Sequence, residues 1–422
     1  MVKDNNWPRK KLGEVILKIG DGGTPSTSVG EYFNGDIPWV NIEDIKKDIW
    51  ETKRHLTSLG LKNSSAKLWP CNTIIFSFGA SIGKVGIAKV SLCTKQGIAG
   101  IIANDKIINY EFLYYSLVRE SGKIKSLAQG MGSTLKEIRP SKLTKLVMIS
   151  LPPLSTQQKI VCILDTIQKA INLQEEIIEK TKELKKSIMA DLFKYGGPSF
   201  RKGRKLKKTE IGEIPEDWET IYLSDKKLFE LQTGLWAGKK GSLMAVKVIR
   251  NTDFEDGKLI FDNVSEIEVE VEQFRKRDLR KDDILIEKSG GGPKQPVGRV
   301  AFINNNLPNY SFSNFLSRIR VITDKIFPAF IFRYLDYFYQ KGGTFNLQER
   351  TTGIRNLRFK DYINQPIPFP SLPEQREIAE ILQTIDQKIE IEQKKKALYE
   401  ELFKTMLNKL MTGEIDVENI NF

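Results

Sequence analysis

The sequence contains very few of the residues on which metal centres and many active sites depend. His55 is its one histidine, and its three cysteines are Cys71, Cys93 and Cys162. With a single histidine, a Ser-His-Asp triad or a histidine-rich zinc site is almost excluded. Because the cysteines are odd in number and widely spaced, without a C-x-x-C pair, a disulfide framework and a thiolate zinc site are also disfavoured. Many classes of enzyme are thereby removed.

The sequence also lacks long apolar runs. None approaches the ~18 residues that a membrane span needs, and residues 1–11 are polar and charged, unlike a signal peptide. We therefore expect a cytoplasmic protein. Hydrophobic residues nevertheless make up 40% of the 422 residues, which is enough for well-packed cores in two to four domains.

Acidic residues are outnumbered by basic ones. The chain has 66 Lys and Arg against 53 Asp and Glu, which gives a formal net charge of +13. Such an excess favours a polyanionic partner, most commonly nucleic acid, although a merely basic soluble protein remains open. Residues 155–193 and 371–411 are together almost neutral, whereas residues 194–208 carry seven basic side chains and no acidic one. The remaining excess therefore lies outside these segments.

Two segments of the chain repeat one another at a constant offset, which places position 369 opposite position 151. LPPLSTQQKIVCILDTI at 151–167 and FPSLPEQREIAEILQTI at 369–385 share eight of 17 positions. The register continues without a gap to Leu184 and Leu402. Since chance would give about one identity in such a stretch, we infer that the chain contains one unit twice.

Weaker matches extend the repeat towards the N-terminus. Trp7 and Leu12 match Trp218 and Leu223, and IGKVGIA at 82–88 matches VGRVAFI at 297–303. Between these landmarks the two copies diverge far more than their last segments do. One architecture with two different surfaces suits a protein that reads two different things.

Each copy ends in a segment with the pattern of a long amphipathic helix, at 151–195 and 369–413. Apolar residues recur every three or four positions over roughly ten turns, and a helix this long needs a partner helix to bury its stripe. We expect the two helices to form an antiparallel coiled coil related by a pseudo-two-fold axis. The alternative is two unrelated surface helices. The expected scaffold positions are Gln157, Ile160, Ile163, Ile167, Leu184, Gln375, Ile378, Ile381, Ile385 and Leu402.

The segments before these helices have the pattern of β-rich domains with some helix. Short apolar runs alternate with Gly, Pro, Asn and Asp, and a helix is expected near 110–121 and near 329–340. The predicted fold class is therefore α+β. Its parts are globular domains at 1–150 and 213–368, a basic linker at 196–212 and a C-terminal tail at 414–422.

Three loops in each copy carry residue types that suit contacts with DNA. Glycine lets the backbone approach phosphates, Ser and Thr donate to them, and Lys, Arg, Asn and Gln can read base edges. Ordinary hairpin turns are the alternative for any one loop. The candidates are Thr24, Ser26, Ser81, Lys84, Ser133, Thr134, Arg139, Arg250, Lys288, Lys294, Gln295, Arg299, Thr352, Arg355 and Asn356, with Arg318, Arg320 and Arg358 as further basic residues to test.

Together these features resemble the specificity (S) subunit of type I restriction–modification systems. The resemblance rests on LPPLSTQQKI and PSLPEQREI, each of which opens a long helix, and it covers the whole chain in the expected order. Trp7, IPEDWE at 214–219 and the Gly23-Thr24-Pro25 loop add to it. The first copy departs slightly from the motif, with Thr156-Gln157-Gln158 where the second copy has Glu374-Gln375-Arg376.

The resemblance implies a DNA-binding subunit without catalytic activity of its own. Each globular part would be a target recognition domain for one half of a bipartite DNA sequence, and the coiled coil would set the gap between the halves. Two modification subunits, with S-adenosylmethionine bound to them, would dock on this scaffold, and restriction subunits could join. The chain itself would bind no cofactor and no metal.

The residues agree with a subunit that performs no chemistry. The sequence has no N-P-P-[FY] or D-P-P-[FY] methylation motif and no glycine-rich S-adenosylmethionine loop between a strand and a helix. It also has no convincing P-D-x(n)-[DE]-x-K nuclease core. Two other hypotheses stay open at this point: a self-contained methyltransferase or nuclease with an unrecognised active site, and a structural adaptor whose basic domains are incidental.

Overall fold

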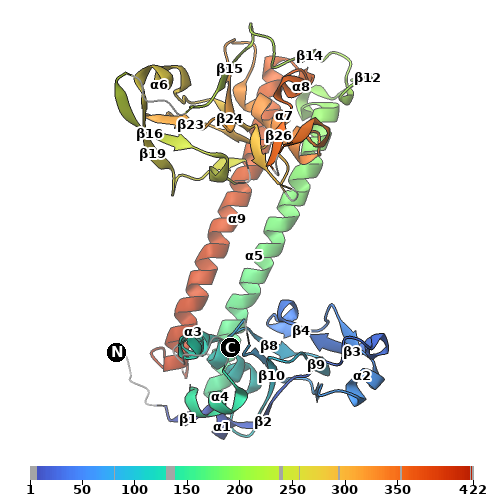
Figure 1. The fold of residues 1–422 in the computed structure, drawn as a ribbon, viewed down its shortest axis with the longest axis vertical. Helices are drawn as coiled ribbons and strands as arrows, with labels where there is room; N and C mark the ends of the chain where they lie inside the picture. Colours follow the sequence, from blue (N-terminus) through green and yellow to red (C-terminus); the bar gives the residue numbers. More distant parts are fainter. Residues whose placement is uncertain are drawn as a thin grey trace. The chain divides into compact units, whose positions relative to one another are not determined.

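Two long helices, α5 (Leu154–Tyr195) and α9 (Leu372–Thr412), follow the two predicted amphipathic segments. The computed structural model describes residues 7–79, 81–129, 138–236, 241–255, 257–292, 295–351, 354–418 and 420 (Figure 1). The chain divides into a first unit, residues 1–175 with 394–422, and a second unit, residues 176–393. Each unit therefore holds one globular domain, part of α5 and part of α9.

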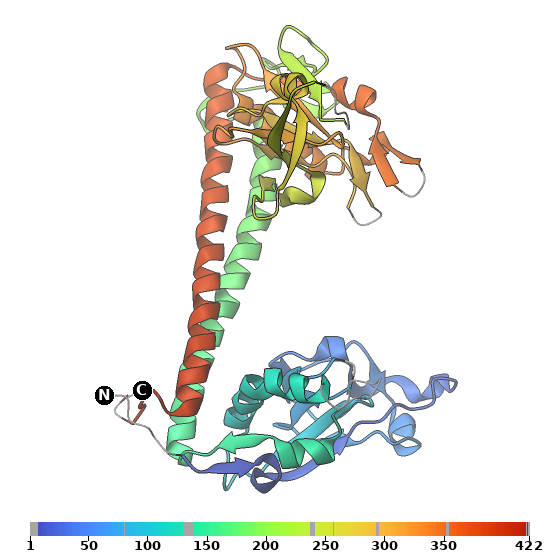
Figure 2. The ribbon, with the colours of Figure 1, turned by 60° about the vertical axis from the view of Figure 1, so that its left-hand side comes forward.

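The globular domain of the first unit contains two larger sheets. One is five-stranded, in the order β2-β10-β7-β8-β4, and the other is four-stranded, in the order β5-β3-β9-β6. Helix α3 (Tyr110–Gln129) contacts β7, β8 and β10 (Figure 2). The strands are β2 (Ile16–Asp21), β3 (Phe33–Val40), β4 (Asp48–Ile49), β5 (His55–Leu56), β6 (Leu68–Trp69), β7 (Ile74–Ser77), β8 (Val85–Ala88), β9 (Leu92–Thr94) and β10 (Ile98–Ala103). Further elements are β1 (Arg9–Lys11), paired with β11 (Met148–Ser150), and helices α1 (Leu12–Val15), α2 (Ser58–Lys62) and α4 (Pro140–Leu146).

The second unit has a related plan, with one strand fewer in each of the two main sheets and with further small sheets. A four-stranded sheet runs β15-β24-β20-β22, a three-stranded sheet runs β19-β16-β23, and α7 (Pro328–Gln340) contacts β22. The strands of these sheets are β15 (Phe229–Thr233), β16 (Leu243–Ile249), β19 (Ser265–Glu270), β20 (Ile284–Glu287), β22 (Val300–Phe302), β23 (Tyr310–Phe312) and β24 (Leu316–Val321). The other elements are the pairs β12 (Leu206–Thr209) with β13 (Gly212–Pro215), β14 (Glu219–Ile221) with β27 (Ile367–Phe369) and β17 (Phe254–Glu255) with β18 (Lys258–Leu259), the sheet of β21 (Ser289–Gly291), β26 (Ile354–Leu357) and β25 (Gln348–Thr351), and helices α6 (Val271–Arg277) and α8 (Phe359–Ile363).

Strand pairing shows that the two domains share one scaffold. Ala99 of β10 pairs with Asp21, and Ser317 of β24 pairs with Thr233. The same two strands pair with β7 and β20, where Ile101 meets Ile74 and Ile319 meets Ile284. Positions that occupy the same place in these ladders are called equivalent below. The repeat therefore extends through the globular domains, where sequence identity alone shows it only weakly.

The core of each unit joins its sheet, its domain helix and both long helices. In the first unit Ile160 and Leu164 of α5 belong to one buried cluster with Leu407 and Leu410 of α9. In the second unit the roles of the two helices are reversed, and the equivalent residues Ile378 and Leu382 of α9 cluster with Met189 and Leu192 of α5. Within each unit, the beginning of one helix thus packs with the end of the other. No described helix is long and apolar enough to cross a membrane.

The predicted apolar stripe is only partly correct. Ile160 and Ile378 are fully buried, and Ile163, Ile167, Ile381 and Ile385 are half-buried, but Leu184 and Leu402 are 55% and 44% exposed. Near Leu184 the inward positions are Ile178, Thr181, Lys185 and Met189, which keep the helical spacing of three to four. The prediction was wrong at Leu184 and Leu402 because it followed apolar residue type at positions where the helical period turns polar side chains inward.

One buried glutamine anchors the start of each long helix, Gln157 in α5 and Gln375 in α9. Gln157 Nε2 donates to the carbonyls of Ile107 and Pro152 at 3.1 and 2.9 Å, and its Oε1 accepts from Asn109 N–H at 2.8 Å. Gln375 makes the same three bonds, with the carbonyls of Lys325 and Pro370 and with Phe327 N–H. Every partner pair is related by the same offset as the two glutamines themselves. The strict part of the repeat therefore begins before the helix and includes the loop that leads into α3 or α7.

The segment predicted as a basic linker, residues 196–212, is folded against the start of α9. The buried carboxylate of Glu374 accepts from Gly197 N–H at 3.0 Å and from both terminal nitrogens of Arg204. Trp218 Nε1 donates to the same carboxylate at 3.0 Å. In the first unit the tail makes related contacts with the start of α5, since Thr156 bonds to Glu418 and Lys159 Nζ donates to the Glu418 carbonyl at 2.6 Å. The charge of Arg204 therefore serves local structure.

Candidate nucleic-acid interface

The glycine-rich loop of the first domain is built for close packing. The N–H groups of Gly22 and Gly23 donate to the carbonyls of Ile98 and Thr94 at 3.0 and 2.9 Å. A Cβ on Gly23 would lie 2.2 Å from the backbone nitrogen of Ala66. These two amides are therefore occupied within the fold, which corrects the expectation that the glycines offer free N–H groups to phosphates.

The other candidates of the first domain are mostly at the surface. Thr24 is half-buried, and Ser26, Ser81, Lys84 and Arg139 are exposed. The hydroxyl of Ser26 bonds to Ser28 at 2.8 Å. The candidates Ser133 and Thr134 lie outside the described residues, as do Lys294 and Thr352 of the second domain.

Lys84 and Arg299 occupy equivalent positions, and each donates a hydrogen bond to a backbone carbonyl of its own domain. Lys84 Nζ donates to the carbonyl of Ile42 at 3.0 Å, and Arg299 Nη2 donates to that of Asn251 at 2.8 Å. Each acceptor opens a short 3₁₀ turn, Ile42–Asp44 or Asn251–Asp253. Arg299 also forms a bidentate ion pair with the buried Glu287, at 2.8 and 2.9 Å. Its guanidinium is thus committed to the fold of the second domain.

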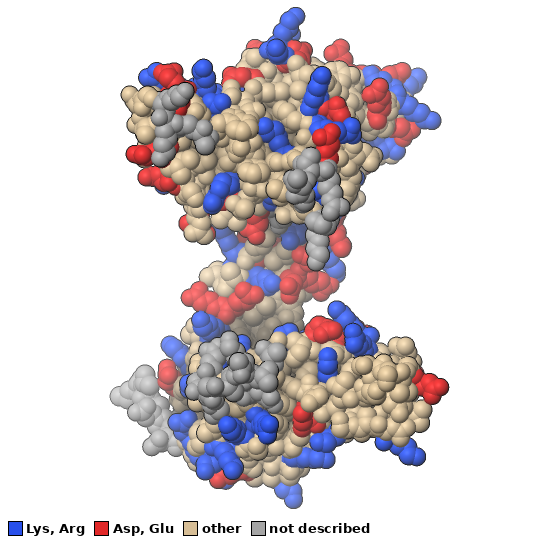
Figure 3. Space-filling model, in the orientation of Figure 1, with Lys and Arg blue, Asp and Glu red and all other residues tan. Residues whose placement is uncertain are grey.

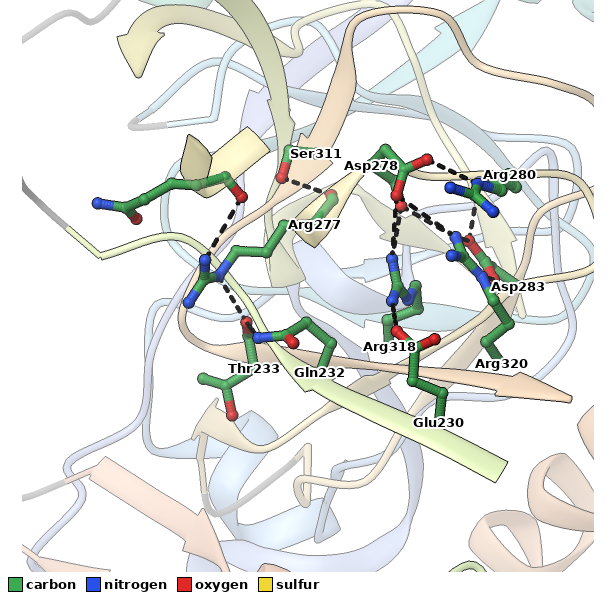
Figure 4. Close-up of polar contacts among 11 residues, drawn as sticks. Glu230, Gln232, Thr233, Arg277, Asp278, Arg280, Asp283, Ser311, Arg318 and Arg320 are labelled. Atoms are coloured by element: carbon green, nitrogen blue, oxygen red, sulfur yellow. Dashed lines mark hydrogen bonds and ion pairs between the residues drawn. The ribbon is translucent and has the colours of Figure 1, made fainter. Parts of the chain in front are cut away.

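Arg318 and Arg320 form part of an internal ion network (Figure 4). Arg318 is 1% exposed and pairs with Glu230, while its Nη1 donates to the Asp278 carbonyl at 2.7 Å. Arg320 forms two bonds to Asp283, at 2.7 and 2.8 Å. Burial lowers the pKa of Arg318, with the neighbouring positive charge of Arg320 acting in the same direction. These two arginines face the interior, so their proposal as DNA-contacting residues is not supported by where they lie.

Several of the remaining candidates of the second domain lie on or next to β20, β21 and β26. Ser289 pairs with Asn356 in the sheet, and their side chains bond to each other. This pairing brings together the second and third predicted loops of this copy, which the sequence could not show. Arg355 is half-buried and Gln295 is exposed. Arg250 is half-buried beside Asp253, and Arg358 pairs with Asp361 at 3.0 Å.

Sequence reasoning selected Lys288 but missed Arg277, and the two converge on one residue. Lys288 Nζ lies 3.2 Å from Thr233 Oγ1, and Arg277 Nε donates to the carbonyls of Thr233 and Gly234 at 2.9 and 3.1 Å. Burial lowers the pKa of both cations. Arg277 ends the short basic helix α6, whose VEQFRKR sequence was a signal for it.

Charge is spread over both globular domains. On the face drawn in Figure 3, blue Lys and Arg side chains and red Asp and Glu side chains are interspersed on each domain. Within the parts of the chain that the structure describes, no group of three or more His, Cys, Asp and Glu side chains is arranged to hold a metal ion. Cys71, Cys93 and Cys162 are all free thiols.

Two copies of one α+β scaffold, each followed by a long helix and each with different polar side chains at equivalent positions, define a duplicated two-domain protein. The model of the type I restriction modification DNA specificity domain matches residues 4–183 and 215–401. The chain therefore belongs to the family of type I restriction–modification DNA specificity subunits. This agrees with the resemblance seen in the two helix-opening motifs.

Relatives of known family match along nearly the whole chain. The type I restriction enzyme MjaVIII specificity subunit of Methanocaldococcus jannaschii is 28% identical over 99% of this chain and 95% of its own length. The EcoBI specificity subunit of Escherichia coli is 23% identical, over 89% and 74%. Among solved structures, the S subunit from M. genitalium has a TM-score of 0.54 at 16% identity, covering 97% of each chain. A chain from a structural study of complex assembly and conformational transition of the type I R-M system has a TM-score of 0.60 at 18% identity. The match covers 97% of this chain and 98% of that chain. These structures share the fold.

Proposed function

We propose that each globular domain binds one half of a bipartite duplex DNA target. In this proposal α5 and α9 form an antiparallel coiled coil with pseudo-two-fold symmetry, which sets the gap between the half-sites. The chain contributes recognition and no catalysis. The observation that carries the proposal is that equivalent positions of one shared scaffold hold chemically different side chains in the two domains.

Four equivalent pairs illustrate this difference in chemistry. Gly100 of the first domain packs under Trp69, and a Cβ there would lie 2.3 Å from the indole ring; Arg318 is its equivalent. Ile102 corresponds to Arg320, Asp21 to Thr233, and Phe78 to Lys288. An apolar, tryptophan-filled interior in one copy thus stands against an ion network in the other. The two domains have therefore diverged chemically on a constant backbone, as is expected of two domains that bind different DNA sequences.

We further propose that two modification subunits dock on the long helices. Leu173 and Ile391 are 57% and 52% exposed and occupy the same place in the two copies of the repeat. Leu184 and Leu402, 55% and 44% exposed, form a second such pair. Exposed aliphatic side chains at the same place in each copy support two identical apolar docking surfaces, and therefore two copies of one partner. S-adenosylmethionine would be bound by those partners, and restriction subunits could complete a nuclease.

Exchange of one domain tests the modular reading of DNA. Residues 7–150 are replaced by the corresponding domain of a relative, the chain is expressed with its modification subunit, and methylated sites are mapped across the genome. We expect one half of the target to change and the other half to stay the same. A change in both halves, or in neither, would contradict the proposal.

A second measurement tests the claim that the chain performs no chemistry. The purified chain is incubated with duplex DNA and S-adenosylmethionine, alone and with the modification subunit. We expect methyl transfer only in the second mixture. Methylation or cleavage by the isolated chain would favour a self-contained enzyme.

A further inference from the structure

Near the end of β15 in the second domain, two basic side chains have no acidic partner within the described part of the chain, whereas other basic side chains around them form ion pairs. Glu230 pairs with Arg318, Asp283 pairs with Arg320, and Asp278 pairs with Arg280 at 2.6 Å (Figure 4). Next to this network, Glu287 pairs with Arg299. The acidic and basic groups of these pairs are equal in number, so their charges cancel.

The two cations left over are Arg277 and Lys288. Among the described residues neither has an acidic partner at ion-pair distance. Arg277 instead donates to three backbone carbonyls, those of Thr233, Gly234 and Gln273. Lys288 contacts the Thr233 hydroxyl and lies 5.5 Å from the ring centre of Phe359. Partly buried cations held only by neutral groups are costly, and an anion beside them would recover that cost.

The two side chains reach the same short segment from different elements. Arg277 comes from the end of α6, Lys288 follows β20, and Thr233 ends β15. Figure 4 shows the Arg277 guanidinium directed at the backbone carbonyl of Thr233. Thr233, Arg277 and Lys288 are each half-buried, so part of each residue remains at the surface. The positively charged end of β15 is therefore open to a ligand.

We propose that Arg277, Lys288 and the Thr233 hydroxyl bind one phosphate group of the DNA backbone, and that this site exists only in the second domain. The proposal rests on the function proposed above. Guanidinium, ammonium and hydroxyl are the donors that position DNA through phosphate oxygens. The hydroxyl that now faces Lys288 can rotate to donate to a phosphate oxygen.

The first domain does not have this combination of residues. Asp21 stands where Thr233 stands, and its carboxylate accepts from Gly97 N–H at 3.0 Å. Phe78, which is 2% exposed, replaces Lys288. The backbone around both is the same, because Ile138 N–H donates to the Phe78 carbonyl and Leu357 N–H donates to that of Lys288. An acid and a buried ring at these places exclude a phosphate, so the site is a difference between the two domains.

Salt-dependent binding of target DNA tests the site. The chain in complex with its modification subunit is titrated with fluorescent duplex carrying the full target, over a range of salt concentrations. Each lost phosphate contact should reduce the slope of log affinity against log salt by about 0.9. We expect this reduction for Lys288→Gln and for Arg277→Gln, with preference for the target sequence retained. Lys276→Gln, which removes an equal charge from an exposed position of α6, is the matched control.

Removing the charge of a single DNA phosphate then distinguishes a direct contact with that phosphate from a general electrostatic effect of the substitution. Duplexes with one methylphosphonate at successive positions of the half-site are compared with unmodified DNA. One position should weaken binding of the wild-type complex and of Lys276→Gln, but have no further effect on Lys288→Gln. Lys288→Arg, which keeps the charge, should retain sensitivity at that position. Thermal unfolding of each variant complex identifies any loss that comes from misfolding of the Arg277 variant.

The outcomes distinguish this site from the function on which it rests. If the wild-type complex prefers its target and Lys288→Gln has an unchanged slope, or couples to no single phosphate, the site is wrong while the function stands. If the wild-type complex shows no preference for any target sequence, the proposed function fails and the site fails with it. Coupling that maps to the half-site of the first domain would also overturn the proposal.

Discussion

Gln157 and Gln375 make the same three hydrogen bonds at the same place in the two copies of the repeat. Each side chain is fully buried and joins the first turn of a long helix to the loop before the domain helix. Both ends of the amide are used, so neither glutamate nor leucine can replace it without leaving a buried backbone group without a partner. One glutamine therefore links each long helix to its own domain by hydrogen bonds, beside the buried apolar cluster that joins them.

Replacement of either glutamine by leucine should destabilise the unit to which it belongs. Each variant leaves one N–H and two carbonyl groups without their side-chain partner, at a cost of about 1–3 kcal/mol for a buried group. Hydrogen exchange is expected to increase around residues 107–109 for Gln157→Leu, and around 325–327 for Gln375→Leu. Gln383→Leu, at an exposed position of α9, serves as control. Equal exchange in all three variants would contradict the anchoring role.

The helices and the duplication could be predicted because they follow local rules. Helical periodicity and a constant, gapless register between the copies specify α5 and α9 without knowledge of long-range contacts. The partners of Arg299, Arg318 and Arg320 could not be predicted, since they lie in or next to strands that meet only in the folded sheet. Leu184 shows the same limit, because its residue type is apolar while its helical phase faces outward. Which arginines are committed to structure is therefore decided by tertiary packing.

Replacement of Arg299 should lower the free energy of unfolding, and any effect on DNA binding should follow from that loss of stability. Glu287 is 1% exposed, and Arg299→Gln would leave its carboxylate without a cation, which typically costs about 3–5 kcal/mol for a buried pair. At the equivalent position Lys84 is exposed and has one backbone acceptor, so Lys84→Gln should cost about 1 kcal/mol or less. Urea denaturation of the two variants measures this difference. Similar losses for both would refute the structural assignment of Arg299.

Asp336 gives a prediction about pH. Burial raises the pKa of this carboxyl, against the opposing effects of Lys185, Gln340 and Arg333. In the folded state the group keeps its proton at pH values where the unfolded chain has lost it, so its contribution to stability falls as pH rises from about 4 through the folded pKa. Asp336→Asn should therefore be more stable than wild type at pH 7 and lose this advantage at about pH 3, where both states are protonated. Thermal unfolding across this range checks the sign, since an advantage that grows towards acid would contradict it.

The exposed leucines of the helices should affect assembly and leave the chain itself intact. Leu184 and Leu402 are equivalent, and each contributes little to the buried clusters because about half of its side chain is in solvent. Leu184→Glu and Leu402→Glu should change the free energy of unfolding by less than about 0.5 kcal/mol, as is usual for surface positions. If each leucine belongs to one of two identical docking surfaces, each single variant should bind one modification subunit normally and the other weakly. Sedimentation analysis of chain and partner mixtures should then show a one-to-one complex for either single variant and little complex for the double variant. Full two-to-one assembly by the double variant would exclude these leucines from the docking surfaces.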